Sequence, residues 1–223
     1  MLVCVGGASA SVVTSNASAA HVATLQQLAV LGSRHDAHRL PSDSAPVVAS
    51  VSSVRPITGE RTVLPIVGQT GKQWLRVMLP GRPNSSTGWI HRSGTRETAT
   101  GWHIVVRTRA RDVSVYYRGR RAASFPAVVG KPSTPTPTGK FFVEENVRMP
   151  ASMVGGPFAL ALSARSNVLQ EFDGGPGQIG IHGRVGLGGM LGQAESHGCM
   201  RLATGAIDWL AARIGPGVPV DIY

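Results

Sequence analysis

The organisation of this chain follows from one stretch, Ser196-His197-Gly198-Cys199-Met200-Arg201, read together with Ile181-His182-Gly183 upstream. Cys199 has a histidine two residues before it and another, His182, 17 positions before it. A thiol with an ordinary pKa of about 8.5 is little ionised at neutral pH, so a nucleophilic cysteine needs a nearby imidazole or a positive environment. Both are available here, which predicts a cysteine nucleophile with a histidine base. One cysteine and two histidines would also suit a metal, and the pattern alone does not decide between the two.

The composition favours a mainly β protein. The 223 residues include 28 Gly and 15 Pro but only 5% aromatic residues, which indicates many turns between short strands. The net charge of +10 is divided evenly, because residues 1–98 carry nine Lys/Arg against four Asp/Glu and residues 99–223 carry thirteen against eight. Charge spread in this way, without a basic run, suits a polyanionic environment such as cell-wall polymers better than a nucleic-acid-binding arm.

Residues 1–40 predict a leader and linker. Leu2 to Val13 resembles the apolar core of a signal segment, and Ala17-Ser18-Ala19 resembles a cleavage site, but the basic leading segment is missing. We therefore expect an extracytoplasmic protein, in the cell wall or periplasm, whose signal segment is incomplete in this sequence. A disulfide between Cys4 and Cys199 would silence the expected nucleophile, so both cysteines are predicted to be free.

Two further features of this leader concern local structure. Leu25, Leu28 and Leu31 lie at near-helical spacing and predict a short helix within residues 20–31. The stretch His35-Asp36-Ala37-His38 offers metal ligands in principle. In a polar linker that ends at Pro41, however, solvated side chains are the expectation.

Residues 41–98 predict a small β-barrel or β-sandwich. Three short apolar runs are separated by turn-forming residues; they are Thr62–Val67, Trp74–Leu79 and Gly88–Ile90. Trp74-Leu75-Arg76-Val77 followed by Gly88-Trp89-Ile90 resembles the bacterial SH3-like modules that accompany cell-wall enzymes. This resemblance implies contact with wall glycan through a tryptophan, whereas filling of a small core is the interpretation we favour for both tryptophans.

Residues 99–223 predict a second β domain with a short C-terminal helix. The expected strands are His103–Arg107, Val113–Tyr117, Ala122–Gly130, Phe141–Val143 and Val218–Tyr223. The loop Pro132–Lys140 contains three prolines, which restrict the backbone and predict a rigid turn that frames a cleft. An apolar face at positions 207, 210, 211 and 214 predicts a helix from about Gly205 to Ile214.

The order of the motifs carries a specific resemblance. A hairpin, the proline-rich loop before Phe141, Pro157-Phe158-Ala159-Leu160, Ile181-His182-Gly183 and Ser196–Arg201 together resemble an L,D-transpeptidase catalytic domain of the YkuD type. The likeness covers nearly all of residues 101–223. It implies a β-sandwich with the cysteine near the mouth of a cleft, and a cysteine-dependent acyltransferase that cross-links peptidoglycan and takes part in cell wall biogenesis and cell shape. It also implies acylation of the cysteine by carbapenems.

The resemblance also implies roles for individual residues. Cys199 becomes the nucleophile, His182 becomes its base, and the backbone carbonyl of Gly183 orients that imidazole. His197 lines the site, where it supports the thiolate or contacts substrate. Three more residues are assigned to substrate or oxyanion contacts; they are Ser196, Gly198 and Arg201. The backbone N–H groups of residues 198 and 199 are expected to face the oxyanion, and the arginine either braces its loop or binds a substrate carboxylate.

The implied reaction needs no cofactor, metal, nucleotide or nucleic acid. The Cys199 thiolate attacks a donor tetrapeptide stem, expels D-alanine and leaves a thioester, which an amine of an acceptor stem then attacks. Water in place of the amine would make the enzyme an L,D-carboxypeptidase. The same residues are also compatible with a metal-dependent hydrolase that uses His182, His197 and Cys199, or with a non-catalytic protein that binds the cell wall.

Three loops are expected to border the cleft. The stretch Gly183–Gln193 is rich in glycine but lacks the Gly-Lys-Ser/Thr ending of a nucleotide loop, so a close-packed loop is expected there. Met149–Gly156 and Gln170–Gly177 are the other two loops. The glycines near Met153 predict a lid at this position.

Overall fold

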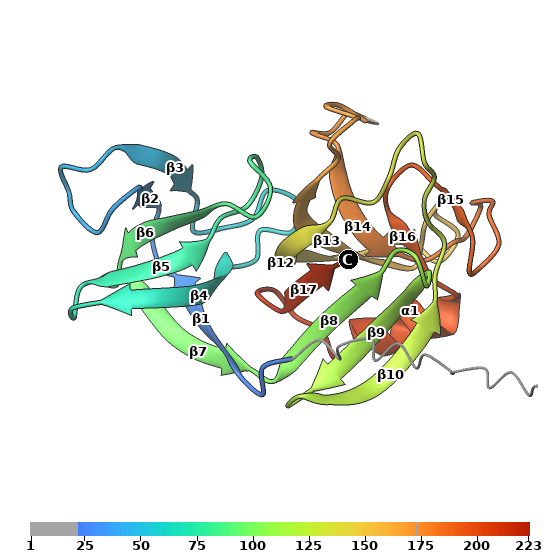
Figure 1. Cartoon of the computed structure of the whole chain (residues 1–223), viewed down its shortest axis with the longest axis horizontal. Coiled ribbons are helices and arrows are strands. Elements are labelled where there is room, and N and C mark those ends of the chain that lie inside the picture. The colour runs from blue at the N-terminus through green and yellow to red at the C-terminus, as the bar shows by residue number, and fades with distance from the viewer. Residues whose placement is uncertain (1–21, 173) are drawn as a thin grey trace, which may run out of the picture.

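A computed structural model describes residues 22–172 and 174–223 and arranges them around two large sheets (Figure 1). The mainly β prediction is confirmed, with a single short helix in the described part of the chain, α1 (Thr204–Ala211). No helix among these residues is long and apolar enough to cross a membrane. The predicted signal segment and Cys4 lie outside the described residues.

The first sheet is antiparallel and has seven strands in the order β3-β2-β6-β5-β4-β1-β7. Their bounds are β1 Gln26–Leu31, β2 His35–His38, β3 Val47–Val51, β4 Val63–Thr70, β5 Trp74–Met78, β6 Thr87–His91 and β7 Thr95–Thr100. Leu75, Val77 and Ile90 are fully buried in its core. Three of the strands correspond to the predicted apolar runs of this region, whereas the SH3-like assignment stays a prediction.

The helix predicted within residues 20–31 is wrong, because the described part of this segment contains no helix and its residues 26–31 form β1. Two neighbours pair with it, β4 on one side and β7 on the other. Leu28 and Leu31 are buried, while Leu25 is exposed. Backbone pairing with two distant strands therefore overrides the helical spacing of the leucines.

The linker prediction for the four residues His35–His38 is also wrong. They form β2, which pairs with β3 and β6. Both histidines are buried, and each ring bonds to backbone carbonyls: His35 to those of Ser33 and Ser93, and His38 to that of Ala45. These side chains close the ends of loops and are not solvated.

The second sheet has eight strands in the order β10-β9-β8-β17-β12-β13-β14-β16. The bounds are β8 Trp102–Arg107, β9 Asp112–Tyr117, β10 Arg120–Pro126, β12 Gly139–Arg148, β13 Phe158–Arg165, β14 Gln178–His182, β16 Met200–Arg201 and β17 Pro219–Ile222. A separate parallel pair joins β11 (Val129–Gly130) to β15 (Ala194–Ser196). The helix α1 packs Ile207 and Leu210 into the core of this part.

The two parts meet along β12. Its Phe142 is buried in the apolar cluster of the first sheet. Its two buried carboxylates bond to a loop of the first part: Glu144 to the side chain of Arg55, and Glu145 to the backbone N–H groups of Ile57 and Thr58. Figure 1 shows β12 at the boundary between the sheets.

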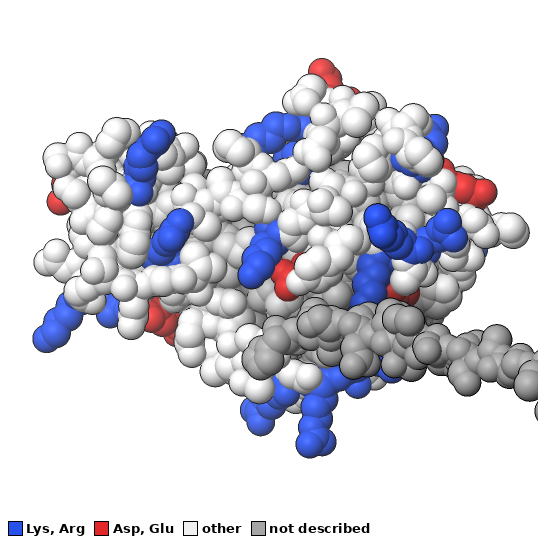
Figure 2. All heavy atoms as spheres, viewed as in Figure 1, with Lys and Arg blue, Asp and Glu red and all other residues white. Residues whose placement is uncertain are grey.

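Basic side chains are distributed over both parts of the molecule. Figure 2 shows them scattered across the visible face, with fewer acidic side chains between them. This distribution agrees with the even division of charge along the chain.

Candidate active site

The two motifs of the chain meet at the end of the second sheet. β14 and β16 run parallel, with Ile181 opposite Met200 and His182 opposite Arg201. Ile181 and Met200 are fully buried. Because side chains alternate between the faces of a strand, burial of Ile181 in the core turns His182 toward the other side. Cys199 directly precedes β16, which begins at Met200.

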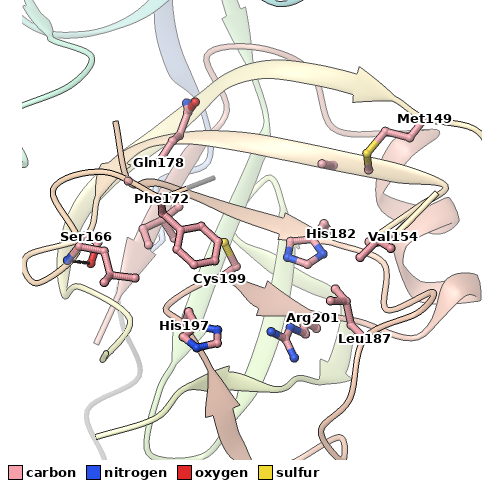
Figure 3. Close-up of a pocket in the computed structure, with 15 residues that line it drawn as sticks. Met149, Val154, Ser166, Phe172, Gln178, His182, Leu187, His197, Cys199 and Arg201 are labelled. Atoms are coloured by element: carbon pink, nitrogen blue, oxygen red, sulfur yellow. Dashed lines mark hydrogen bonds between the residues drawn. The ribbon is translucent and has the colours of Figure 1, made fainter. Parts of the chain in front are cut away.

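The side chains of His182 and Cys199 both line a pocket of about 660 Å³. Figure 3 shows Cys199, His182, His197 and Arg201 around one cavity, with Phe172 in front of the cysteine. Its other walls come mainly from apolar and small residues: Met149, Val154, Gly155, Ala159, Ser166, Leu169, Gly177, Gln178, Ile179 and Leu187. All three predicted loops contribute to this lining.

The proton positions of His182 follow from a single bond. Its Nδ1 lies 2.6 Å from the carbonyl oxygen of Gly183, which can only accept a hydrogen bond. Nδ1 therefore carries the proton, and Nε2 is left with a lone pair that can take a proton. Burial lowers the pKa of His182, and the positive charge of Arg201 lowers it further, while the bond to Gly183 opposes them. The imidazole is thus neutral at neutral pH.

Cys199 is a free cysteine that is partly exposed to the pocket. Its Sγ accepts a hydrogen bond of 3.4 Å from the backbone N–H of Gly180. Burial raises the pKa of the Cys199 thiol, and this effect outweighs the opposing influence of the Gly180 N–H and of Arg201. Both shifts favour the uncharged forms, a thiol at Cys199 and a neutral imidazole at His182.

Close packing explains the glycine that follows the histidine. A Cβ atom at Gly183 would lie 1.9 Å from the carbonyl oxygen of Gly156. A Cβ at Gly155 would lie 3.2 Å from Nδ1 of His182. Backbone of the loop between β12 and β13 therefore approaches His182 closely, which only glycine permits at these positions.

Ser196 holds the turn that presents the cysteine. It is fully buried, and its Oγ accepts the N–H of Gly198 at 3.1 Å and donates to the carbonyl of Cys199 at 2.6 Å. The N–H of Gly198 is thus occupied inside the turn, which does not fit its predicted role as an oxyanion donor. The φ angle of Gly198 is +121°, a conformation that L side chains rarely adopt.

The proline-rich loop supports this same turn, a role that the sequence did not predict. Thr136 Oγ1 donates to the carbonyl of Gly198 at 2.8 Å, and Thr134 Oγ1 donates to that of Ser196 at 3.2 Å. Both threonines are buried. The alternation of threonine and proline was the available signal: the prolines restrict the backbone, and the threonines between them supply the donors.

His197 and Arg201 lie at the edges of the pocket. The His197 ring stacks on Phe172 with centroids 5.6 Å apart, and its Nε2 lies 3.5 Å from Nζ of Lys131. Arg201 donates to the carbonyl of Gly188 at 2.9 Å, so it braces the glycine-rich loop. Its Nε is buried without a hydrogen-bond partner among the described residues.

The geometry ranks the two histidines. His182 has a ring orientation set by a backbone carbonyl and a free nitrogen, whereas His197 is engaged by an aromatic ring and a lysine. Within residues 22–172 and 174–223, no three His, Cys, Asp or Glu side chains come together as metal ligands.

Comparison with known proteins identifies the class that this fold and site represent. Residues 101–222 match the family model of the YkuD L,D-transpeptidase catalytic domain, so the chain belongs to this family. The chain is 29% identical over 149 residues to the Bacillus subtilis protein named "Putative L,D-transpeptidase YkuD", a match that covers 66% of this chain and 73% of that protein.

Solved structures of L,D-transpeptidases are also similar to this chain. One is L,D-transpeptidase 3 from Mycobacterium tuberculosis in complex with a faropenem-derived adduct, with 16% identity and a TM-score of 0.45 over 70% of this chain and 96% of that one. Another is an Enterococcus faecium L,D-transpeptidase, with 21% identity and a TM-score of 0.43 over 55% of this chain. The present chain spans about half (49%) of that protein's length.

Proposed function

We propose that this member of the YkuD family is a peptidoglycan L,D-transpeptidase in which Cys199 forms a thioester acyl-enzyme. The observation that carries the proposal is the tautomer of His182. Its Nδ1 proton is held by the carbonyl of Gly183, which leaves Nε2 free to take the thiol proton in the same pocket. A third group that orients the base is the general requirement for an activated nucleophile.

The first half of the reaction transfers the stem peptide to the enzyme. His182 Nε2 takes the proton of the Cys199 thiol, and Sγ attacks the carbonyl carbon that precedes the terminal D-alanine of a donor tetrapeptide. The C–N bond breaks, the D-alanine nitrogen receives the proton from His182, and a thioester remains on Cys199. The N–H of Gly180, which contacts Sγ at 3.4 Å, supports the transient thiolate.

The second half restores the enzyme. The side-chain amine of an acceptor stem attacks the thioester carbonyl, His182 takes a proton from this nitrogen, and the C–S bond breaks as the proton returns to Sγ. Because the N–H of Gly198 is engaged by Ser196, the N–H of Cys199 is the donor that we assign to the oxyanion from this turn. A base that is neutral at neutral pH suits both proton transfers.

The substrate binds in a pocket lined mainly by apolar side chains, with Arg201 as its charged group. The Nε of Arg201, buried and without a partner among the described residues, suits an anionic oxygen of the stem peptide. We infer an extracytoplasmic location, where such stems occur. Contact of the first part with wall glycan would use Trp89, which is partly buried, more readily than Trp74, which is buried.

Intact-mass spectrometry of the purified chain tests this function. Incubation with a donor tetrapeptide muropeptide should add the mass of the stem without D-alanine, and incubation with a carbapenem should add one drug molecule. Adding an amine acceptor should discharge the first adduct into a cross-linked product, whereas release of free tripeptide alone would identify an L,D-carboxypeptidase. A protein that forms neither adduct would contradict the proposal.

A further inference from the structure

The loop between β5 and β6 belongs to the first part of the molecule but bonds to a wall of the pocket in the second. The guanidinium of Arg82 donates three hydrogen bonds to backbone carbonyls of that wall. Their lengths are 2.8 Å to Pro176, 2.8 Å to Ser166 and 3.3 Å to Leu169. One planar group with several donors thus fixes two ends of one loop at once.

Asn84 from the same loop adds a second set of contacts. Its Nδ2 donates to the carbonyl of Arg165 at 2.8 Å and to Oδ1 of Asn167 at 3.1 Å, while its Oδ1 accepts the N–H of Arg165 at 2.9 Å. The side chain therefore satisfies both backbone groups of one residue, as a neighbouring strand would. It does so where β13 ends and the pocket wall begins.

The segment that these two side chains hold is part of the candidate substrate site. Ser166, Leu169, Phe172 and Gly177 all line the pocket, and Phe172 stacks on His197. This segment has little apolar burial to hold it, since Val168 is 52% exposed and Phe172 is 51% exposed. Its position therefore depends mainly on hydrogen bonds, several of which come from the first part.

Buried ion pairs of Glu144 form a second connection between the first part of the molecule and the sheet that carries the pocket. Glu144 accepts from Arg165 on β13 and from Arg55 of the first part. Its Oε2 also lies 3.4 Å from Nε2 of Gln178, which lines the pocket. Two separate loops of the first part thus reach groups adjacent to the pocket.

We propose that Arg82 and Asn84 are positioning residues for the substrate pocket, so that the first part of the chain sets the wall against which the donor stem packs. The effect that this proposal predicts on the KM for the donor rests on the proposed function, whereas the effect that it predicts on hydrogen exchange does not. The first part then acts within the molecule, by shaping the pocket, independently of any contact with the cell wall.

Hydrogen exchange tests the structural consequence. In Arg82→Ala, amides of residues 165–172, 174, 175 and 177 should exchange about tenfold faster or more, because bonds from a charged donor are lost. Amides of β14 should keep their protection. The control is Arg76→Ala on β5, an exposed arginine of the same part that bonds to Thr87 and does not reach the pocket. Unchanged exchange in Arg82→Ala would overturn the proposal.

Steady-state kinetics test the functional consequence. The KM for the donor muropeptide should rise about tenfold in Arg82→Ala while kcat stays within about twofold, because binding is weakened and the reacting groups are left in place. Arg82→Lys should not restore KM, since an ammonium group cannot span three carbonyls. Asn84→Asp keeps the acceptor for the Arg165 N–H but turns a carboxylate oxygen toward the Arg165 carbonyl, so it should raise KM at least as much as Asn84→Ala.

The outcomes separate the two proposals. Faster exchange with an unchanged KM would overturn the role in substrate binding. A fall in kcat with an unchanged KM would overturn it too, because it would place the effect on the chemistry. If the wild type forms no acyl-enzyme, the proposed function fails, and the exchange measurement alone then decides whether Arg82 positions the pocket wall.

Discussion

The pocket has two walls that are held in different ways. One is carried by strands: His182 ends β14, Arg201 ends β16, and the residues paired beside them, Ile181 and Met200, are fully buried. The other is carried by loops that include Val154, Phe172 and Leu187, with much of their apolar surface exposed to the cavity or to solvent.

This difference assigns different tasks to the two walls. Strand pairing over a packed core holds His182 and the neighbouring Cys199 in a narrow range of positions, as the proposed nucleophile and base require. The loop wall is held by individual side-chain bonds, which can give way locally without unfolding the sheet. Changes at Cys199 and His182 should therefore alter the chemistry, and changes in the loop wall should alter binding.

The largest effect is expected at Cys199, which directly precedes β16 of the strand wall. Cys199→Ala removes the attacking atom, and loss of a nucleophile lowers turnover by about 10⁶-fold in well-studied hydrolases. The fold should persist, because within the described part of the chain Sγ accepts a single weak hydrogen bond, from the N–H of Gly180. Mass spectrometry should show no adduct with donor or carbapenem, and circular dichroism should be unchanged; turnover by this variant would refute the assignment.

Substitution of each of the two histidines allows a direct comparison of the two walls. His182→Ala removes the base and should slow acylation by about 10²- to 10⁴-fold. His197→Ala removes a ring that stacks on Phe172 of the loop wall. Loss of an aromatic pair of this kind should slow acylation by about tenfold or less. Stopped-flow acylation by a carbapenem measures both rates. Equal losses would mean that the histidines have been ranked wrongly.

The thermal stability of two glycine variants, Gly183→Ala and Gly188→Ala, measures how closely the strand wall packs against the neighbouring loop. Gly183→Ala places Cβ 1.9 Å from the carbonyl oxygen of Gly156, so it should destabilise the fold by about 1–3 kcal/mol. In a chain of this size, Tm falls by about 2–4 °C for each kcal/mol. Gly188→Ala meets no atom within 4 Å and serves as the control. Similar melting curves for the two variants would show that the loop yields to the added methyl group.

The smallest expected effect is electrostatic. Burial lowers the pKa of His182, so the acid limb of kcat/KM should lie below the ordinary histidine value of about 6.5. Arg201 lowers the pKa of both His182 and Cys199; removing its charge in Arg201→Met should therefore raise both pKa values and move the acid limb to higher pH. The measurement is a pH profile of carbapenem acylation.

Arg184→Met is the matched control for that profile. Arg184 also braces the glycine-rich loop, through a bond of 2.7 Å to the carbonyl of Gly189, but it does not contribute to the shift at His182. Its acid limb should stay at the wild-type position. If the acid limb moves equally in Arg201→Met and Arg184→Met, the shift comes from the loop and not from the charge of Arg201.

Local patterns predicted most of the second part and failed at the start of the first. The runs that became β8 and β9 alternate or are apolar over several residues, so burial and strand propensity agree there, as they do for β5 of the first part. In β1, leucines at helical spacing indicated a helix, but pairing with β7 helps to make it a strand, and the residues of β7 lie more than sixty positions after their partners in β1. Such distant pairing leaves no signal in a short window of sequence.

The sequence by itself determined the chemistry that the site can offer. Cys199 and His182 are recognisable because their predicted roles require particular residue types, a thiol and an imidazole. The need for a residue without Cβ at position 183 follows only from the approach of the Gly156 carbonyl. Only the tertiary structure decided which of their hydrogen bonds are already used. Ser196 occupies the N–H of Gly198, and Arg82 reaches the pocket wall from another part of the chain. Such contacts depend on distances between segments far apart in the sequence, which folding alone brings together.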